Sequence, residues 1–227
     1  MAVVTVLTGI GAGLGGMLLA LLLHAIQHVA YGYSVAHVIG SESFLTGVTA
    51  AEPLRRLAVL TVCGIVAGGG WWALYRYGRP LVSIRRAVRA ADPRMPFVST
   101  TVHALLQIVT VALGSPLGRE VAPREIGSLL AGRFAHAARL TPGDCRLMVA
   151  CGAGAGLAAV YNVPLGGAIF VLEVLLGTFE LRALIVAVLT SAIAAGVPMG
   201  GLGNWAQETE AAFLVRPALA AVAMRFR

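Results

Sequence analysis

The residues best suited to chemistry lie at three turns, each with a polar residue or a proline just ahead of an apolar stretch. The turns are residues 78–82, 114–123 and 161–164. Proline is well tolerated in the first turn of a helix, so each turn predicts a helix start. Free backbone N–H groups and the helix dipole at such a start favour small anions. The turns therefore predict anion sites.

Glu120 lies in the second turn, within the segment Gly118-Arg119-Glu120. One interpretation is structural, because a carboxylate near a helix start interacts with the helix dipole and contributes about 0.3–1 kcal/mol. The other is functional, because an ionisable residue among membrane segments commonly marks an ion pathway. Spacing alone favours the structural interpretation.

Other candidate groups give weaker signals. His24 and His28 lie four residues apart, as metal ligands often do, but no third ligand is near in sequence. We therefore prefer hydrogen-bonded helix packing to a metal site. Cys63, Cys145 and Cys151 have no disulfide or zinc spacing and are interpreted as packing residues. No hydrolase, metalloprotease or P-loop motif occurs, so the sequence predicts neither an enzyme nor a cofactor.

The elements that must position these residues are membrane helices. The chain has 227 residues, of which 58% are hydrophobic and 12% charged, a composition unusual for a water-soluble domain. No charged residue precedes Glu42, and uncharged runs follow at 57–75, 95–118, 147–172 and 183–207. Several runs exceed the roughly 20 residues that span a bilayer. The predicted class is an all-α polytopic protein, integral to a plasma or inner membrane.

Positive charge predicts the orientation. The 17 basic residues are all arginines, and the net charge is +7. In a soluble protein this excess of positive charge would suggest that the protein binds nucleic acid. Here arginines cluster after a predicted span, so we expect a cytoplasmic segment and no nucleic-acid partner. The clustered residues are Arg76, Arg79, Arg85, Arg86, Arg89 and Arg94.

The apolar segments differ in regularity. The first segment, about Val3 to Ile39, is too long for one upright span, so we expect it to tilt or bend. It lacks the basic start of a cleaved signal, so we expect the span to be retained. The glycines of this segment suit close helix contact. In the second apolar segment, Gly64 and Gly68 form a GxxxG pair. After residue 78, prolines interrupt the apolar stretches, which predicts broken helices.

Residues 151–173, CGAGAGLAAVYNVPLGGAIFVLE, resemble a signature stretch of the CLC chloride channel and transporter family. Gly118-Arg119-Glu120 with Ile126-Gly127 is similar to the family's GREGP segment, and residues 22–33 resemble its first membrane helix more weakly. The resemblance implies a CLC-like bundle of tilted and broken helices, with the first inverted repeat at 1–197 and a divergent tail at 198–227. It also implies a homodimer that pairs through the helix at about 181–197.

The resemblance assigns roles to individual residues. Glu120 would be the gate, because its carboxylate occupies an anion site in the family's pore and withdraws when protonated. Glu173 is a candidate for a proton path, whereas Val174 stands where the family's exchangers carry a second glutamate. The implied anion-binding residues are Gly78, Arg79, Pro80, Leu81, Gly118, Arg119, Val121 and Ala122.

Departures from the family pattern shape the functional expectation. Arg79 stands where the family has an anion-coordinating serine, so chloride preference is in doubt if this residue lines the pore. The alternative interpretation is that Arg79 is an arginine of a cytoplasmic loop. Val121 and Ala122 replace a glycine and a proline, and Val174 is channel-like. We expect gated passive permeation of an anion such as chloride. The alternatives are a chloride/proton antiporter and a truncated half-subunit that needs a separately encoded second half.

Overall fold

The computed structural model describes residues 1–32, 48–49, 51–90 and 92–202, and these are helical, with no strand among them. The predicted all-α bundle of long and broken helices is confirmed. The long helices are α1 (Ala2–Tyr31), α3 (Pro53–Tyr77), α5 (Phe97–Ala112), α6 (Val121–Ala137), α7 (Pro142–Tyr161) and α9 (Leu181–Leu202). The short ones are α4 (Ile84–Arg89), α8 (Pro164–Ile169) and the π-helix η2 (Phe170–Leu176).

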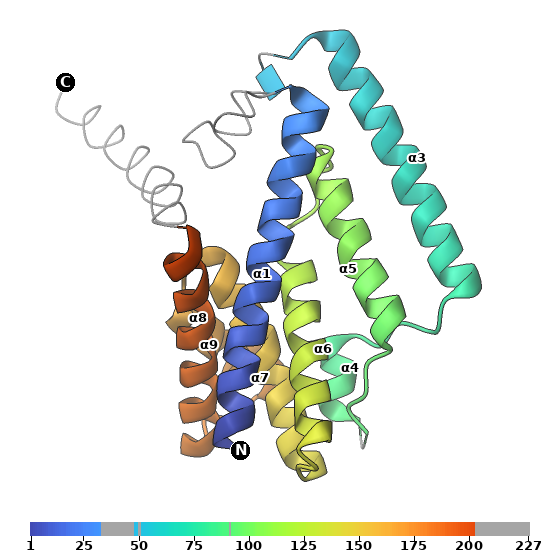
Figure 1. Ribbon diagram of the computed structural model, residues 1–227. Coiled ribbons are helices and arrows are strands. Elements are labelled where there is room, and N and C mark those ends of the chain that lie inside the picture. The colour runs from blue at the N-terminus through green and yellow to red at the C-terminus, as the bar shows by residue number, and fades with distance from the viewer. Residues whose placement is uncertain (33–47, 50, 91, 203–227) are drawn as a thin grey trace, which may run out of the picture.

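Helix α1 runs through the bundle, packed against α6, α7 and α9, with α5 beside it (Figure 1). Its glycines allow this packing, because a Cβ added at Gly9 would lie 2.7 Å from Ile193 Cβ, and one at Gly13 would lie 2.7 Å from Val197 Cβ. The expected close contact is confirmed. The helix ends at Tyr31, and its cap Gly32 has a left-handed φ of 76°. The predicted end of the apolar segment at Ile39 lies outside the described residues. The 30 residues of α1 span about 45 Å and require tilt in a core about 30 Å thick.

Helices α6 and α7 touch backbone to backbone. A Cβ added at Gly127 would overlap the carbonyl oxygen of Gly152, and one at Gly156 would overlap that of Pro123. The core continues from this contact, with Met148 and Val149 fully buried in one cluster with residues of α4, α6 and α9. The small-residue run of α7 therefore serves packing, and it fixes the start of α6 against α7.

The predicted interruptions are confirmed at all three turns. Helix α3 ends at Tyr77 and α4 begins at Ile84, while α5 ends at Ala112 and α6 begins at Val121. Helix α7 ends at Tyr161, and α8 begins at Pro164 after only two residues. Proline and glycine therefore punctuate the chain where the sequence indicates.

Helix α3 lies apart from the rest, on the far side of α5 (Figure 1). Only Cys63 and Leu74 are buried along it, and nothing lies within 4 Å of a Cβ added at Gly64 or Gly68. The GxxxG face of this helix therefore has no partner within the described part of the chain.

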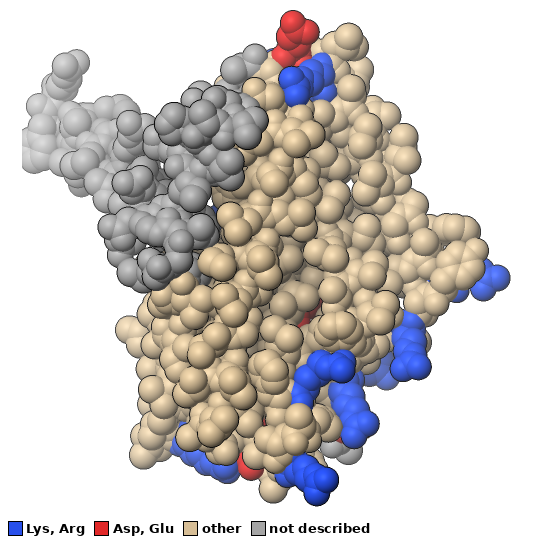
Figure 2. Space-filling view, in the orientation of Figure 1, with Lys and Arg blue, Asp and Glu red and all other residues tan. Residues whose placement is uncertain are grey.

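Among the described residues, three helices, α1, α3 and α7, are long and apolar enough to cross a membrane. Most of the arginines visible in Figure 2 gather at the end of the molecule where α4 lies, below a largely uncharged band. Arg85, Arg86 and Arg89 of α4 are exposed there. This separation of charge supports the predicted orientation, in which the arginine-rich end faces the cytoplasm.

Candidate functional site

Glu120 occupies the N-cap position of α6. Within the described part of the chain, its carboxylate caps no amide of that helix. Instead it folds back over Gly118, where an added Cβ would overlap it, and the Tyr161 hydroxyl donates to Oε2 at 3.4 Å. The carboxylate therefore lies at the helix start, where it can interact with the dipole, without capping an amide, and the role of Glu120 as a gate remains a prediction.

The turn after α7 forms the other side of this site. Asn162 adopts a left-handed φ of 53°, which ends α7 and redirects the chain into α8. The guanidinium of Arg119 lies 5.2 Å from the centre of the Tyr161 ring, within cation–π range. The second and third predicted turns are thus brought together.

Arg124 connects this site to the π-helix. Its Nε donates to the carbonyl oxygen of Glu120 at 3.0 Å, and its guanidinium carbon lies 5.4 Å from the centre of the Phe170 ring. Sequence reasoning missed the roles of Arg124 and Tyr161 here. The available signal was the position of Arg124, four residues after Glu120 and so one helical turn along.

The remaining predicted residues of this turn differ in burial. Ala122 is 1% exposed and packs with residues of α1 and α5, so only its backbone is free to serve an anion. Val121 and Arg119 are half-buried, and Gly118 is exposed. A cavity of about 20 Å³, which has room for one water molecule, is lined by Arg119 and Pro123 beside His24.

The first predicted turn lies elsewhere. Gly78, Arg79 and Pro80 are exposed, and Leu81 is half-buried. A Cβ added at Gly78 would meet Leu74 and Ser99, neither of which contacts Glu120. No contact found among the described residues joins the 78–81 segment to the Glu120 turn, so the shared anion cradle remains a prediction.

Glu173 and Val174 are both exposed on η2. No ion pair of Glu173 is found among the described residues. The proton-path role of Glu173 remains a prediction.

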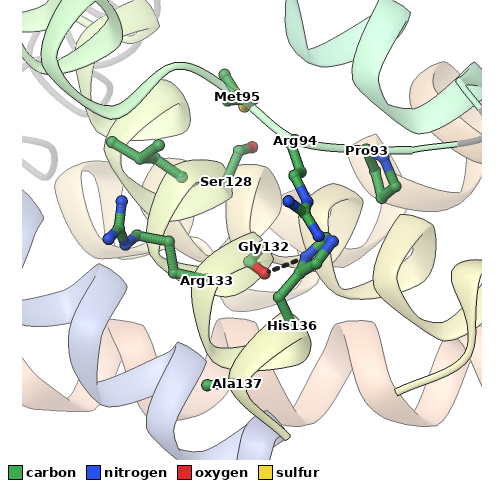
Figure 3. A pocket seen from close by; sticks show the side chains of 9 residues that line it. Pro93, Arg94, Met95, Ser128, Gly132, Arg133, His136 and Ala137 are labelled. Carbon is green, nitrogen blue, oxygen red and sulfur yellow. Dashed lines mark hydrogen bonds between the residues drawn. The ribbon is translucent and has the colours of Figure 1, made fainter. Parts of the chain in front are cut away.

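A hollow of about 420 Å³ lies near the arginine-rich end, outside the predicted set (Figure 3). Arg133 lies on one side, Arg94 and His136 on the other, and Gly132 between them. His136 Nε2 lies 3.4 Å from Asp92, which also pairs with Arg94. This acidic partner offsets part of the positive charge of the rim.

The remaining candidate ligands act in packing. The three cysteines are free and buried, as expected of packing residues. His24 Nδ1 lies 2.8 Å from the Ala20 carbonyl oxygen, one turn earlier in α1. No group of three or more metal-ligating side chains is found in the described ranges.

Residues 61–223 match the family described as Voltage gated chloride channel. The chain belongs to this family. Its relatives include the voltage-gated ClC-type chloride channel ClcB of Citrobacter koseri, 33% identical over 67% of this chain and 37% of the relative. ClcB of Yersinia pseudotuberculosis is 32% identical over 65% of this chain and 37% of the relative. ClcB of Escherichia coli is 32% identical over 68% of this chain and 37% of the relative. The chain spans about 37% of the length of these curated relatives.

Family membership establishes a membrane protein with a CLC-like helical bundle, related to channels and transporters rather than to enzymes. The matched region begins within α3, so the weaker resemblance of residues 22–33 lies outside it. It also continues past residue 197 to 223, and the predicted boundary between the half-domain and a divergent tail remains a prediction.

Proposed function

We propose that this chain provides the gated part of a passive anion pathway, with Glu120 as the gate and chloride as the most direct candidate ion. The observation that carries the proposal is the position of the Glu120 carboxylate. It lies at the start of α6, uses none of that helix's amides, and contacts the Tyr161 hydroxyl ahead of α8. This position leaves those amides open to a free anion, and a tethered carboxylate that rotates toward them competes with the anion for the same N–H groups.

Passive permeation is favoured over exchange by Val174, an apolar residue at the position where exchangers of the family carry a glutamate. Glu173, beside it, is exposed on η2. Support for chloride comes from the ClcB relatives, whose names describe chloride channels.

A half-subunit that conducts only with a second half is the other candidate, because the chain spans 37% of the ClcB relatives. The open GxxxG face of α3 is a surface that such a half could cover. We further propose a homodimer that pairs through α9 in a multi-pass inner-membrane protein. Support comes from exposed apolar side chains on this helix, which are Leu184, Ile185 and Leu189.

The test is chloride efflux from liposomes that contain the purified 227-residue protein, compared with Glu120→Gln. Glu180→Gln is the matched control, because it neutralises an exposed glutamate without touching the Glu120 turn. We expect Glu120→Gln to raise efflux and Glu180→Gln to leave it unchanged. Equal efflux from wild type and Glu120→Gln would contradict the gate.

Two further results separate the alternatives. Proton movement coupled to chloride would identify an antiporter. If well-folded, inserted protein conducts nothing, the chain alone is not a channel, and the half-subunit candidate stands.

A further inference from the structure

The hollow near the arginine-rich end plays no part in the proposed gate. Residues of the later half of α6 line it from one side, and residues 93–95, just before α5, line it from the other (Figure 3). Its volume of about 420 Å³ lies in the range of small-ligand sites. Glu120 is not part of its lining. The hollow is therefore a separate candidate site.

Arg133 supplies one cationic group of the lining. Its guanidinium carbon lies 4.6 Å from the centre of the Phe97 ring, at the start of α5. No ion pair or side-chain hydrogen bond of Arg133 is found within the described part of the chain. Stacking on a ring uses the face of a guanidinium and leaves the N–H groups along its edge, a planar fork that matches a phosphate. Arg133 is thus held in place with its donors available to a ligand.

Arg94 and His136 stand opposite Arg133 (Figure 3). Oδ1 of Asp92 lies 3.3 Å from Nε of Arg94 and 3.4 Å from Nε2 of His136. This pairing holds the two side chains together, and it engages Nε of Arg94 rather than the terminal nitrogens of the guanidinium. Asp92 itself does not line the hollow. Among the residues that the structure describes, the lining holds two arginines and no carboxylate, so it favours an anion.

Much of the remaining lining is apolar. Pro93 and Leu129 are buried, and Met95 is half-buried. Beside the hollow, at the start of α5, Phe97 is 46% exposed and Val98 is 72% exposed. A free inorganic ion would leave these apolar side chains uncovered. An amphiphile with an anionic head would cover them and gain from their burial.

The hollow also lies at the level expected of a lipid headgroup. Figure 2 shows the arginines gathered at one end of the molecule, below a largely uncharged band, and headgroups lie where such a band ends. Arg94 belongs to the arginine-rich segment that follows α3. Basic pockets between membrane helices at the cytoplasmic face are suited to the phosphates of anionic lipids.

We propose that this hollow binds the headgroup of an anionic phospholipid. Arg133 and Arg94 hold the phosphate from opposite sides, and the apolar lining takes the glycerol and the first carbon atoms of the chains. The site goes beyond anion permeation, because binding of a lipid requires neither flux nor a second half.

The test is binding of palmitoyl-oleoyl phosphatidylglycerol to the full chain in a non-ionic detergent, with native mass spectrometry counting the lipids bound per chain. We expect a single saturable site. Arg133→Gln should weaken binding by about fivefold or more, because it removes a cation that faces the phosphate. Arg85→Gln is the matched control, since it removes the same charge from an exposed position of α4 outside the hollow, and it should change the affinity by less than about twofold.

A second variant leaves every charge in place. Ala137 is exposed and lines the hollow, so Ala137→Phe puts a ring where the lipid would lie and should also weaken binding. If Arg133→Gln does not give a folded circular dichroism spectrum, Ala137→Phe decides. Wild-type affinity in Ala137→Phe overturns the site.

Three other results also overturn the proposal. Equal losses in Arg133→Gln and Arg85→Gln would show a general attraction to the positive surface. Equal binding of phosphatidylcholine, which has no net charge, would show that the anionic head is not recognised. Displacement of the lipid by inorganic phosphate alone would identify a site for the free ion. A chain that conducts no anion still binds the lipid, so failure of the gate and failure of the lipid site are distinguishable.

Discussion

Substituting Gly152 with alanine should separate α6 from α7. The added methyl would overlap the carbonyl oxygen of Gly127 and lie 2.7 Å from Ala131 Cβ. Both obstacles belong to α6 and are backbone or a side chain of a single carbon, so neither can rotate away. The two helices themselves must move apart.

Gly143 supplies a matched control on the same helix, because nothing lies within 4 Å of a Cβ added there. Replacing glycine by alanine inside a helix raises its stability by up to about 1 kcal/mol through backbone entropy, and both variants gain part of this stabilisation. Overpacking a filled contact costs about 1–3 kcal/mol. We therefore expect Gly152→Ala to be about 1–3 kcal/mol less stable than Gly143→Ala.

The assay is unfolding of the detergent-solubilised protein by increasing fractions of dodecyl sulfate, followed by circular dichroism. The unfolding free energies of the two variants are compared under identical conditions. If Gly152→Ala were as stable as Gly143→Ala, the direct backbone contact between α6 and α7 would be refuted.

Three further predictions use the same preparations. Tyr161→Phe removes the hydroxyl that donates to Glu120, so anion efflux should rise by up to about tenfold, and unchanged efflux would exclude a restraining role. Tyr31→Phe leaves the Leu113 carbonyl without its 2.9 Å partner and should cost about 1 kcal/mol in the unfolding assay; no loss would show that the bond is not stabilising. Gly114→Ala places a side chain at a φ of 98° and should cost about 1–2 kcal/mol, with wild-type stability as the contradicting result.

The sequence predicted the helices and their interruptions because both depend on local chemistry. Apolar runs identify spans, and proline with glycine marks breaks, as at Pro164 and Gly114. The end of α1 before Gly32 does not follow from hydropathy, because the apolar run continues beyond it. Hydropathy measures partition into lipid, whereas a left-handed glycine ends a helix through backbone geometry.

The candidate site was predictable only in part. Glu120 stood out as an ionisable group between apolar segments, but its contact with Tyr161 depends on how two turns 41 residues apart are packed. The contact of Arg124 with Phe170 escaped notice for the same reason, since spacing does not tell which faces of two helices meet. The shared cradle of the 78–81 segment and the Glu120 turn comes from the family pattern alone, and it stays a prediction.

The glycine contact between α6 and α7 also limits the motion by which a gate at Glu120 can operate. Layers of side chains between helices allow small sliding movements, because they can exchange rotamers as the backbones shift. Between Gly127 and Gly152 no such layer exists. Sliding of α6 along α7 is therefore blocked, and the motion left to a gate at the start of α6 is rotation of its own side chain or movement of the two helices together. If the side chain rotates alone, the opening rate should respond to substitutions around the carboxylate and remain insensitive to bilayer thickness.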